Sequence, residues 1–287
     1  MWFGSYACNT FCEYNMKTRE FGISVVIPSY NRIDTLLRAV DSIDSCQKEK
    51  VEIIVVDDCS DFDIYSVLQR YNKNNIPIRI FKNSTNKGPQ VSRNVGIRRA
   101  SFEFVAFLDS DDYFSPDKID WLLQILANQD IDLLYHAVDG CEKYNKISNL
   151  WFKTFGKLLH FRWFICLLNP CVTPSVVIRV KKCLFNPTLR YSEDYAFLLS
   201  YVESTTRVKY CDSVHTTVPR AIGTTGGVSG NLIKMRKGEI KGKENLLRKN
   251  NVSHIFQYAL SLIFVSARVL SDLIRKRYNF KDFIKSN

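Results

Sequence analysis

Three carboxylates stand within four positions at the end of one apolar run. The run reads Val-Ala-Phe-Leu from Val105 to Leu108, and the acids are Asp109, Asp111 and Asp112. Carboxylates crowded at one strand end repel one another and resist burial unless a cation neutralises them. Mg²⁺ and Mn²⁺ are commonly held by one or two carboxylates together with substrate phosphates. The spacing therefore indicates a divalent-metal site that serves a nucleotide diphosphate, although an acidic surface turn that caps the next helix has the same composition.

The first half of the chain alternates short apolar runs with longer segments of helical periodicity. The β-branched runs predict strands, and the segments between them predict helices. Several runs are apolar on both faces, which is typical of a parallel sheet covered by helices on each side. We expect strands at 23–27, 51–56, 76–81 and 132–136, and helices at 33–43, 64–68, 91–97 and 116–127. We also expect Ser60 or Asp61 to cap the second helix, a polar turn at 143–148 and a return strand at 203–210.

Polar side chains follow three of the expected strands. Asp58 follows the strand at 51–56, Asn86 follows the strand at 76–81, and the three aspartates follow the apolar run that ends at Leu108. In parallel α/β sheets, ligands bind beyond the carboxyl ends of the strands. These groups, distant in sequence, are therefore expected to meet at one crevice.

Four ordered motifs give this part of the chain a family resemblance. They read Val-Val-Ile-Pro-Ser-Tyr-Asn-Arg at 25–32, Val-Val-Asp-Asp-Cys-Ser-Asp at 55–61, Asn-Lys-Gly with Ser-Arg-Asn-Val-Gly at 86–96, and Leu-Asp-Ser-Asp-Asp at 108–112. Together they resemble the family 2 glycosyltransferases, which adopt the nucleotide-diphosphosugar transferase fold called GT-A. The resemblance implies an α/β fold with a mostly parallel central sheet flanked by helices, and a nucleotide diphosphate sugar as donor.

The same resemblance implies roles for individual residues on the donor side. Asp58 would accept a hydrogen bond from the base, with Pro28 and Tyr30 beside the nucleotide. Asp109 and Asp111 would form the aspartate-x-aspartate motif that handles ribose and metal. The other donor-side candidates within the motifs are Arg32, Asn86, Arg93, Asn94 and Ser110. Asn94 and Gly96 also have an alternative explanation, which is close packing of their helix.

A further match concerns the acceptor side. Arg190-Tyr-Ser-Glu-Asp194 resembles the family's glutamate-aspartate motif, which opens a helix beneath the acceptor site. An inverting sugar transfer needs a carboxylate to take the proton from the attacking hydroxyl while metal neutralises the leaving diphosphate. We expect Asp194 to be this base and Glu193 to orient it or the acceptor. The alternative is an ordinary helix start, which favours acids, with Ser192 as its cap. Two acceptor-binding candidates come from a segment that resembles the family's acceptor strand: Thr173 and Ser175.

The carboxyl-terminal part of the chain differs in composition. From Ile233 onward, 13 basic residues oppose 4 acidic ones, and this excess of nine supplies most of the net charge of +11. An apolar segment at 255–270, broken by Arg268, is too short and too interrupted to predict a membrane span. It fits a basic amphipathic helix on anionic lipid, or alternatively a helix packed on the catalytic domain with solvated lysines. No nucleic-acid motif accompanies the charge, so no nucleic-acid partner is expected. The glycine-rich stretch 223–230 resembles loops that close over a donor diphosphate.

The whole sequence supports one enzyme of the cytosol. A chain of 287 residues with 46% apolar content can bury a substantial core. We expect an extension at 1–20, a GT-A domain at 21–230 and a helical tail at 231–287. Nine cysteines without a paired Cys-x-x-Cys site favour reduced thiols, and no signal peptide is predicted.

These observations predict an inverting glycosyltransferase that depends on Mn²⁺ or Mg²⁺. Its donor would be a UDP-sugar and its acceptor a glycan hydroxyl, borne by a polyprenyl diphosphate at the inner face of the cell membrane. Assembly of O-antigen, capsule or exopolysaccharide fits this reaction. Two alternatives stay open: a nucleotidyltransferase, whose first loop usually carries a glycine-rich phosphate grip that 28–32 lacks, and a non-catalytic protein that binds membranes.

Overall fold

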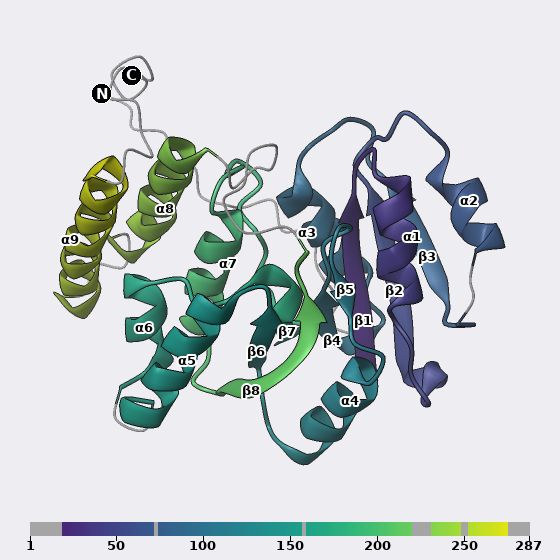
Figure 1. Ribbon diagram of the computed structural model, residues 1–287, viewed down its shortest axis with the longest axis horizontal. Helices are drawn as coiled ribbons and strands as arrows, with labels where there is room; N and C mark the ends of the chain where they lie inside the picture. The colour runs from purple at the N-terminus through teal and green to yellow at the C-terminus, as the bar shows by residue number, and fades with distance from the viewer. Residues whose placement is uncertain (1–18, 72–73, 157–158, 220–230, 248–251, 275–287) are drawn as a thin grey trace.

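The computed structural model describes residues 19–71, 74–156, 159–219, 231–247 and 252–274. Within them one eight-stranded sheet carries helices on both faces (Figure 1). Nearly all of the expected extension at 1–20 and the glycine-rich stretch at 223–230 lie outside the described residues. The strands are β1 (Glu20–Ser29), β2 (Val51–Asp57), β3 (Ile78–Lys82), β4 (Phe102–Phe107), β5 (Tyr113–Phe114), β6 (Leu133–Asp139), β7 (Val176–Arg179) and β8 (Val208–Thr217). The α-helices are α1 (Ile33–Asp41), α2 (Ile64–Arg70), α3 (Pro89–Arg99), α4 (Lys118–Asn128), α5 (Glu142–Thr154), α6 (Phe161–Leu167), α7 (Glu193–Val202), α8 (Leu232–Leu247) and α9 (Val252–Ile274), with short 3₁₀ turns at η1 (Lys48–Lys50) and η2 (Thr173–Ser175).

The strand order is β3-β2-β1-β4-β7-β6-β8-β5. The first four strands in this order run parallel, whereas β7 runs antiparallel to both β4 and β6. The parallel strands place their carboxyl ends at the same edge of the sheet, which is where ligands bind in α/β folds. The predicted α/β class is confirmed, and the sheet becomes mixed beyond β4.

Both faces of the parallel strands are buried, which explains why their sequences are apolar without interruption. In β1, Ile23, Val25 and Ile27 face a core that includes side chains of α1, α2 and α4. Val26 points to the opposite core, which includes α3, α6 and α7. The apolar alternation along one strand thus serves two helical layers.

Three local predictions differ from the structure. The segment 143–148 belongs to helix α5 rather than to a turn, because Ile147, Trp151 and Phe152 recur at helical spacing and pack on the core. The cap of α2 is Asp63, whose carboxylate accepts from the backbone N–H groups of the first turn. The return strand begins at Val208 and not at residue 203, since α7 continues to Val202.

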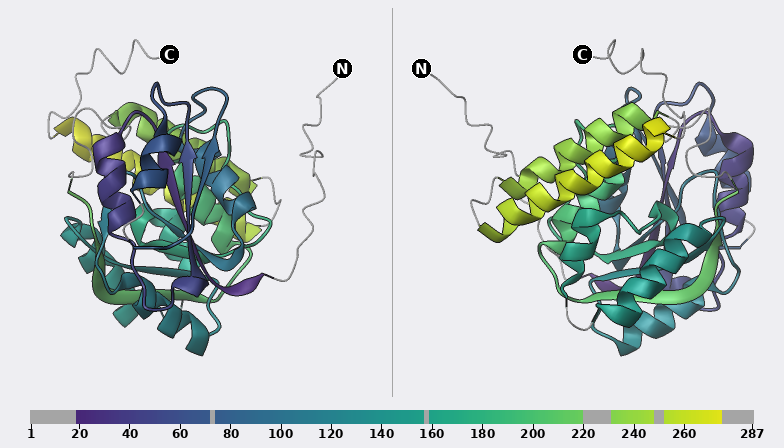
Figure 2. Two further views of the ribbon diagram at one scale, coloured as in Figure 1. Left: turned by 90° about the vertical axis from the view of Figure 1, so that its right-hand side faces the viewer. Right: turned by 60° about the vertical axis from the view of Figure 1, so that its left-hand side comes forward.

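The last two helices pack on the rest of the protein. Helix α8 lies against α7, and α9 lies against α8 and α6 (Figures 1 and 2). Two glycines allow the approach of α8: a Cβ at Gly238 would lie 2.1 Å from the carbonyl oxygen of Tyr191, and one at Gly242 would lie 2.8 Å from the Cβ of Ala196. The start of α7 is therefore in direct contact with α8.

Candidate active site

The loops after β1 and β2 are joined at the carboxyl edge of the sheet. The backbone N–H of Asn31 donates to Ser60 Oγ at 2.9 Å, and its side-chain amide donates to Asp61 Oδ2 at 2.7 Å. The backbone N–H of Asp61 donates back to Asn31 Oδ1 at 2.9 Å. Asn31 has a φ of 52°, in the left-handed region that asparagine tolerates better than most residues. These bonds connect two of the family-like motifs, at 25–32 and 55–61, at this edge of the sheet.

Asp58 holds the loop that contains Asn86. Its carboxylate accepts from Asn83 Nδ2 at 2.8 Å and from the backbone N–H groups of Lys87 and Gly88 at 2.9 and 2.7 Å. The side chain is buried, whereas Asn86 is exposed. The contacts of Asp58 therefore shape the loop that leads into α3, a role that the sequence did not indicate.

A cavity of about 480 Å³ lies beside the first loop and includes Asp111. Its lining includes Arg32, which pairs with the Asp111 carboxylate, and Arg38, whose Nη2 donates to the Asp111 carbonyl oxygen at 3.0 Å. Tyr30 is exposed nearby in sequence, and Pro28 is buried within β1. The cavity thus brings together two expected donor residues, Arg32 and Asp111. Of these, Arg32 was predicted only from the family-like motif at 25–32.

The aspartate cluster contains one carboxyl whose ionised form is disfavoured. Asp112 is buried, and burial raises the pKa of its carboxyl to about 8, with the charges of Asp109 and Asp111 adding to the effect against Arg38 and Lys118. No group of three or more metal-ligating side chains is found within the described residues. Two carboxylates completed by substrate phosphates still suit Mg²⁺ or Mn²⁺. The hard oxygen donors of these crowded carboxylates therefore fit a divalent cation.

Arg93 lies at the centre of the site and joins its two sides. This buried guanidinium donates from Nη2 to Asp109 Oδ1 at 2.6 Å and from Nη1 to Glu193 Oε1 at 3.2 Å. Burial acts to lower the pKa of Arg93, but the charges of Asp109 and Glu193 outweigh it and raise the pKa. The structure thus connects the donor-side aspartates to the acceptor-side acids through one side chain, and Ser110 lies buried between the aspartates.

Glu193 and Asp194 form the first turn of α7. Burial raises the pKa of Glu193 to about 7, with the charge of Asp194 adding to the rise and Arg93 opposing it. Burial also raises the pKa of Asp194, again against Arg93. The helix start is not a simple cap, because Ser192 has a φ of 54° and its hydroxyl donates to the carbonyl oxygen of Met235 instead. The raised pKa of Glu193 lies close to neutral pH, so the pair can accept and release a proton there, which suits a general base.

Asn94 makes the contacts of helix packing. Its Nδ2 donates to the carbonyl oxygen of Phe185 at 2.8 Å, and the Phe185 N–H donates to its Oδ1 at 2.8 Å. A Cβ at Gly96 would lie 2.3 Å from a methyl of Val26, so α3 sits close on β1. Both residues secure α3, and this helix in turn positions Arg93.

The candidate acceptor segment is held by a lysine that sequence reasoning missed. Lys118 is completely buried, and its Nζ donates to the Pro174 carbonyl oxygen and to Thr216 Oγ1, both at 2.8 Å. Ser175 is also buried, and its hydroxyl donates to the carbonyl oxygen of Val172 within the turn, whereas Thr173 is partly exposed. A lysine at a helix start gives no sequence signal of this role.

Comparisons with known proteins agree with this geometry. The model of the family described as glycosyl transferase family 2 matches residues 24–179, more than half of the chain. The chain belongs to the family 2 glycosyltransferases. An uncharacterized glycosyltransferase of Haemophilus influenzae is 29% identical over 91% of this chain and 93% of its own length. Part of the Campylobacter jejuni GalNAc(5)-diNAcBac-PP-undecaprenol beta-1,3-glucosyltransferase is 40% identical, over 36% of this chain and 33% of that protein.

Solved structures place this family 2 glycosyltransferase in the GT-A fold. Staphylococcus aureus TarS 1–349 in complex with UDP-GlcNAc aligns with a TM-score of 0.62 and 18% identity, over 79% of this chain and 67% of that one. The mannosyltransferase PcManGT of Pyrobaculum calidifontis, in complex with GDP-Man and Mn²⁺, aligns with a TM-score of 0.60 and 13% identity, over 94% and 84%. The chain spans 33–38% of the length of its Rickettsia relatives.

Proposed function

We propose that this family 2 glycosyltransferase moves a sugar, with inversion, from a UDP-sugar to a hydroxyl of a glycan acceptor. The observation that carries the proposal is the bridge of Arg93 between Asp109 and Glu193. It brings the carboxylates proposed for the donor and those proposed for the acceptor into one polar network at the edge of the sheet. A reaction that joins two substrates needs such a meeting point.

On the donor side, Asp109 and Asp111 would hold Mn²⁺ or Mg²⁺ together with the diphosphate. The bound metal would neutralise the charge of the leaving diphosphate. Arg32, which now pairs with Asp111, is the cation placed to contact a phosphate once Asp111 binds metal. Support comes from the crowded carboxylates around Asp112 and from the Mn²⁺ named with the PcManGT structure.

On the acceptor side, Asp194 would accept the proton of the attacking hydroxyl. The acceptor oxygen bonds to the anomeric carbon, the bond from that carbon to the diphosphate oxygen breaks, and UDP leaves with the electron pair. Attack from the face opposite the diphosphate inverts the anomeric centre. The raised pKa of the Glu193 and Asp194 carboxyls supports this assignment, because a base works best when its pKa is close to the working pH.

The acceptor that we propose is a glycan on polyprenyl diphosphate in bacterial surface polysaccharide synthesis. Support comes from the C. jejuni relative, whose name includes a PP-undecaprenol acceptor, and from TarS, a poly(ribitol-phosphate) beta-N-acetylglucosaminyltransferase. Such an acceptor would place the enzyme in the cytoplasm, at the inner face of the cell membrane.

A panel of nucleotide sugars tests the donor and the metal together. We expect a UDP-sugar with Mn²⁺ to raise the melting temperature, because a ligand of the folded form stabilises it, and we expect release of UDP to stop with EDTA. Asp111→Asn should weaken both effects. The control Asp130→Asn, at a position between α4 and β6, should leave both unchanged. Turnover that survives EDTA would remove the metal role of Asp111. Release of pyrophosphate from a nucleoside triphosphate and a sugar phosphate would instead support a nucleotidyltransferase.

A further inference from the structure

Helix α9 is amphipathic, but it turns its polar side toward the protein and its apolar side outward. Of the four side chains that it buries between Ser253 and Leu270, three are polar and the fourth is Val265: Gln257 and Ser261 are fully buried, and His254 is nearly so. Its outward face carries Phe256 and Ile263, which are 59% and 65% exposed. A helix on the surface of a globular protein normally turns its apolar side toward the core.

Specific contacts fix this orientation. His254 Nε2 lies 2.9 Å from Glu203 Oε2 at the end of α7, and Arg268 pairs with Glu239 of α8. The backbone carbonyl oxygen of Gln257 accepts from Cys166 Sγ at 3.5 Å. Buried ion pairs and hydrogen bonds of this kind depend on direction, so rotation of α9 to bury its apolar side would leave charges without partners. The outward apolar face is therefore part of the folded arrangement.

The outward face is continuous and uncharged. Between Ser253 and Leu270 every exposed residue is apolar except Ser266, and the large ones are Ile255, Phe256, Ile263, Phe264 and Leu270. This stretch has a mean hydropathy of 1.3, and it is long and apolar enough to cross a membrane by length and composition. Contiguous apolar surface of this kind marks an interaction site rather than ordinary exposure.

Positive charge accompanies this face. On α8, Lys234, Lys237 and Lys241 are exposed and their spacing of three and four residues puts them in one row, which ends at the exposed Glu244. The sequence Arg-Lys-Arg at 275–277 follows α9 directly. An apolar helix face with cationic neighbours matches the acyl chains and anionic headgroups of a lipid surface.

We propose that the outward face of α9 docks on an anionic membrane, with the helix lying along the surface and the lysine row of α8 contacting headgroups. Insertion across the bilayer would pull His254 and Arg268 away from Glu203 and Glu239, which disfavours a spanning arrangement. A second copy of the chain is a poorer occupant, because two such faces would bring two sets of cationic residues together.

The docking surface is coupled to the start of α7. Ser192 Oγ donates to the carbonyl oxygen of Met235 in α8 at 2.9 Å, and Gly238 lies against Tyr191. Figure 1 shows α8 between α7 and α9, so the two carboxylates of the first turn of α7 are separated from the docking helix by a single helix. If the proposed acceptor role of Asp194 holds, docking presents that carboxylate to an acceptor anchored in the same membrane. This last step rests on the proposed function, whereas docking itself does not.

Co-sedimentation of the full chain with vesicles tests the proposal. We expect binding to vesicles of phosphatidylcholine mixed with phosphatidylglycerol, weaker binding to phosphatidylcholine alone, and a loss of about tenfold or more for Phe256→Ser/Ile263→Ser. The matched control is Tyr65→Ser/Leu150→Ser, which removes side chains that are 53% and 63% exposed elsewhere on the surface. Replacing Lys234, Lys237 and Lys241 with glutamine should abolish the preference for phosphatidylglycerol.

Several outcomes would overturn the docking proposal. An equal loss of vesicle binding in the two double variants would show nonspecific hydrophobic adsorption. Unchanged vesicle binding in Phe256→Ser/Ile263→Ser would exclude this face of α9. A lipid-free dimer in sedimentation velocity that Phe256→Ser/Ile263→Ser dissociates would assign the face to a second copy. Resistance to carbonate extraction would show a spanning helix instead. Melting curves of each variant verify folding, and vesicle binding needs no turnover, so an inactive but membrane-bound protein would contradict only the proposed function.

Discussion

Two buried aspartates of this protein, Asp132 and Asp112, respond to burial in opposite ways. Their exposed fractions are 2% and 5%, yet the pKa of Asp132 is lowered to about 2, whereas that of Asp112 is raised to about 8. Burial alone raises the pKa of both carboxyls. The difference therefore comes from what surrounds each carboxylate.

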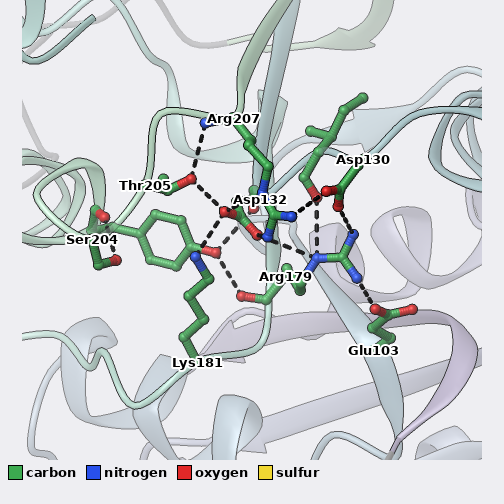
Figure 3. Close-up of polar contacts among 10 residues, drawn as sticks. Glu103, Asp130, Asp132, Arg179, Lys181, Ser204, Thr205 and Arg207 are labelled. Atoms are coloured by element: carbon green, nitrogen blue, oxygen red, sulfur yellow. Dashed lines mark hydrogen bonds and ion pairs between the residues drawn. The ribbon is translucent and has the colours of Figure 1, made fainter. Parts of the chain in front are cut away.

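Asp132, just before β6, is surrounded by cations and hydroxyls (Figure 3). Arg207 donates to it through Nε at 2.9 Å and Nη2 at 2.6 Å, Lys181 donates through Nζ at 2.8 Å, and Thr205 Oγ1 donates as well. These bonds join the first residue before β6 to the segments after β7 and before β8. A cavity of about 460 Å³ adjoins the cluster, but Lys181 and Arg207 in its lining already neutralise Asp132.

In the cluster that includes Asp112, three carboxylates lie close together, and at Asp112 burial and the charges of Asp109 and Asp111 outweigh the attraction of Arg38 and Lys118. Arg93 and Arg32 pair with Asp109 and Asp111, and Lys118 is committed to backbone and hydroxyl oxygens. A buried acid with a strongly raised pKa at the edge of a sheet, such as Asp112, is commonly part of a functional site. The comparison teaches that the balance of charge around an acid, rather than its burial, separates a structural carboxylate from one that can bind a cation.

The largest expected effect comes from Asp194→Asn. Loss of the base should lower the rate of transfer by roughly 10²–10⁴-fold, with donor binding retained. Folding should be unharmed, because the change removes a poorly compensated charge. Initial rates, donor-induced thermal shifts and melting curves measure the three effects. If Asp194→Asn lowers stability but leaves the transfer rate unchanged, Asp194 stabilises the fold, as Asp132 does, and is not the base.

The second effect is a change in pH dependence. Burial raises the pKa of Glu193 to about 7 and also raises the pKa of the neighbouring base Asp194, so kcat/KM should rise with pH as the two acids lose their proton. Arg93→Met removes the cation that lowers both pKa values, so the midpoint should move upward. Each unit of upward shift costs about tenfold in the ionised fraction near neutral pH. The expected loss is therefore greater at neutral than at alkaline pH, with partial recovery in Arg93→Lys, and an equal loss at every pH would limit Arg93 to a structural role.

The sequence predicted the parallel half of the fold well and the rest less well. Apolar runs such as 51–56 are buried on both faces, so local composition alone identifies the strand. Helix α5 was missed because its core contacts come from few residues, among them Trp151 and Phe152, within a polar segment. Its buried side packs on β6 and β8, and β8 is distant from α5 in the sequence.

The site was predictable only in its motifs. Asp109, Asp111, Glu193 and Asp194 stand out by residue type and position, and the structure brings Asp109 and Glu193 onto the same arginine. The contact between Arg93 and Glu193 spans 100 residues of sequence, so it depends on how the fold places α3 relative to α7. The lysine that holds Pro174 likewise comes from a distant helix, and a buried lysine has no sequence signature.

The third effect concerns stability and the Asp132 cluster. Asp132→Asn should lower the free energy of unfolding by about 2–3 kcal/mol, since it leaves Arg207 and Lys181 without their buried anion. The exposed neighbour gives a control: Asp130→Asn should cost less than about 1 kcal/mol. Because the folded pKa of Asp132 lies below the ordinary value of 3.8, its contribution is present above that pH and is lost as pH falls toward about 2. Urea unfolding at several pH values measures both quantities.

The smallest effect has the opposite sign and completes the comparison. Asp112→Asn should raise the free energy of unfolding by about 1 kcal/mol without metal, because a neutral amide is buried at less cost than a carboxylate and removes the repulsion from Asp109 and Asp111. Asp117→Asn is the matched control on the following turn: the hydrogen bond from Ser115 lowers the pKa of Asp117, so its loss should be slightly destabilising. Stabilisation by Mn²⁺ should also decrease in Asp112→Asn, since asparagine cannot lose a proton to supply negative charge when the cation binds. If Asp112→Asn instead destabilises the protein as Asp132→Asn does, then the Asp112 carboxylate is stabilised by its surroundings, and the proposed difference between the two acidic clusters is wrong.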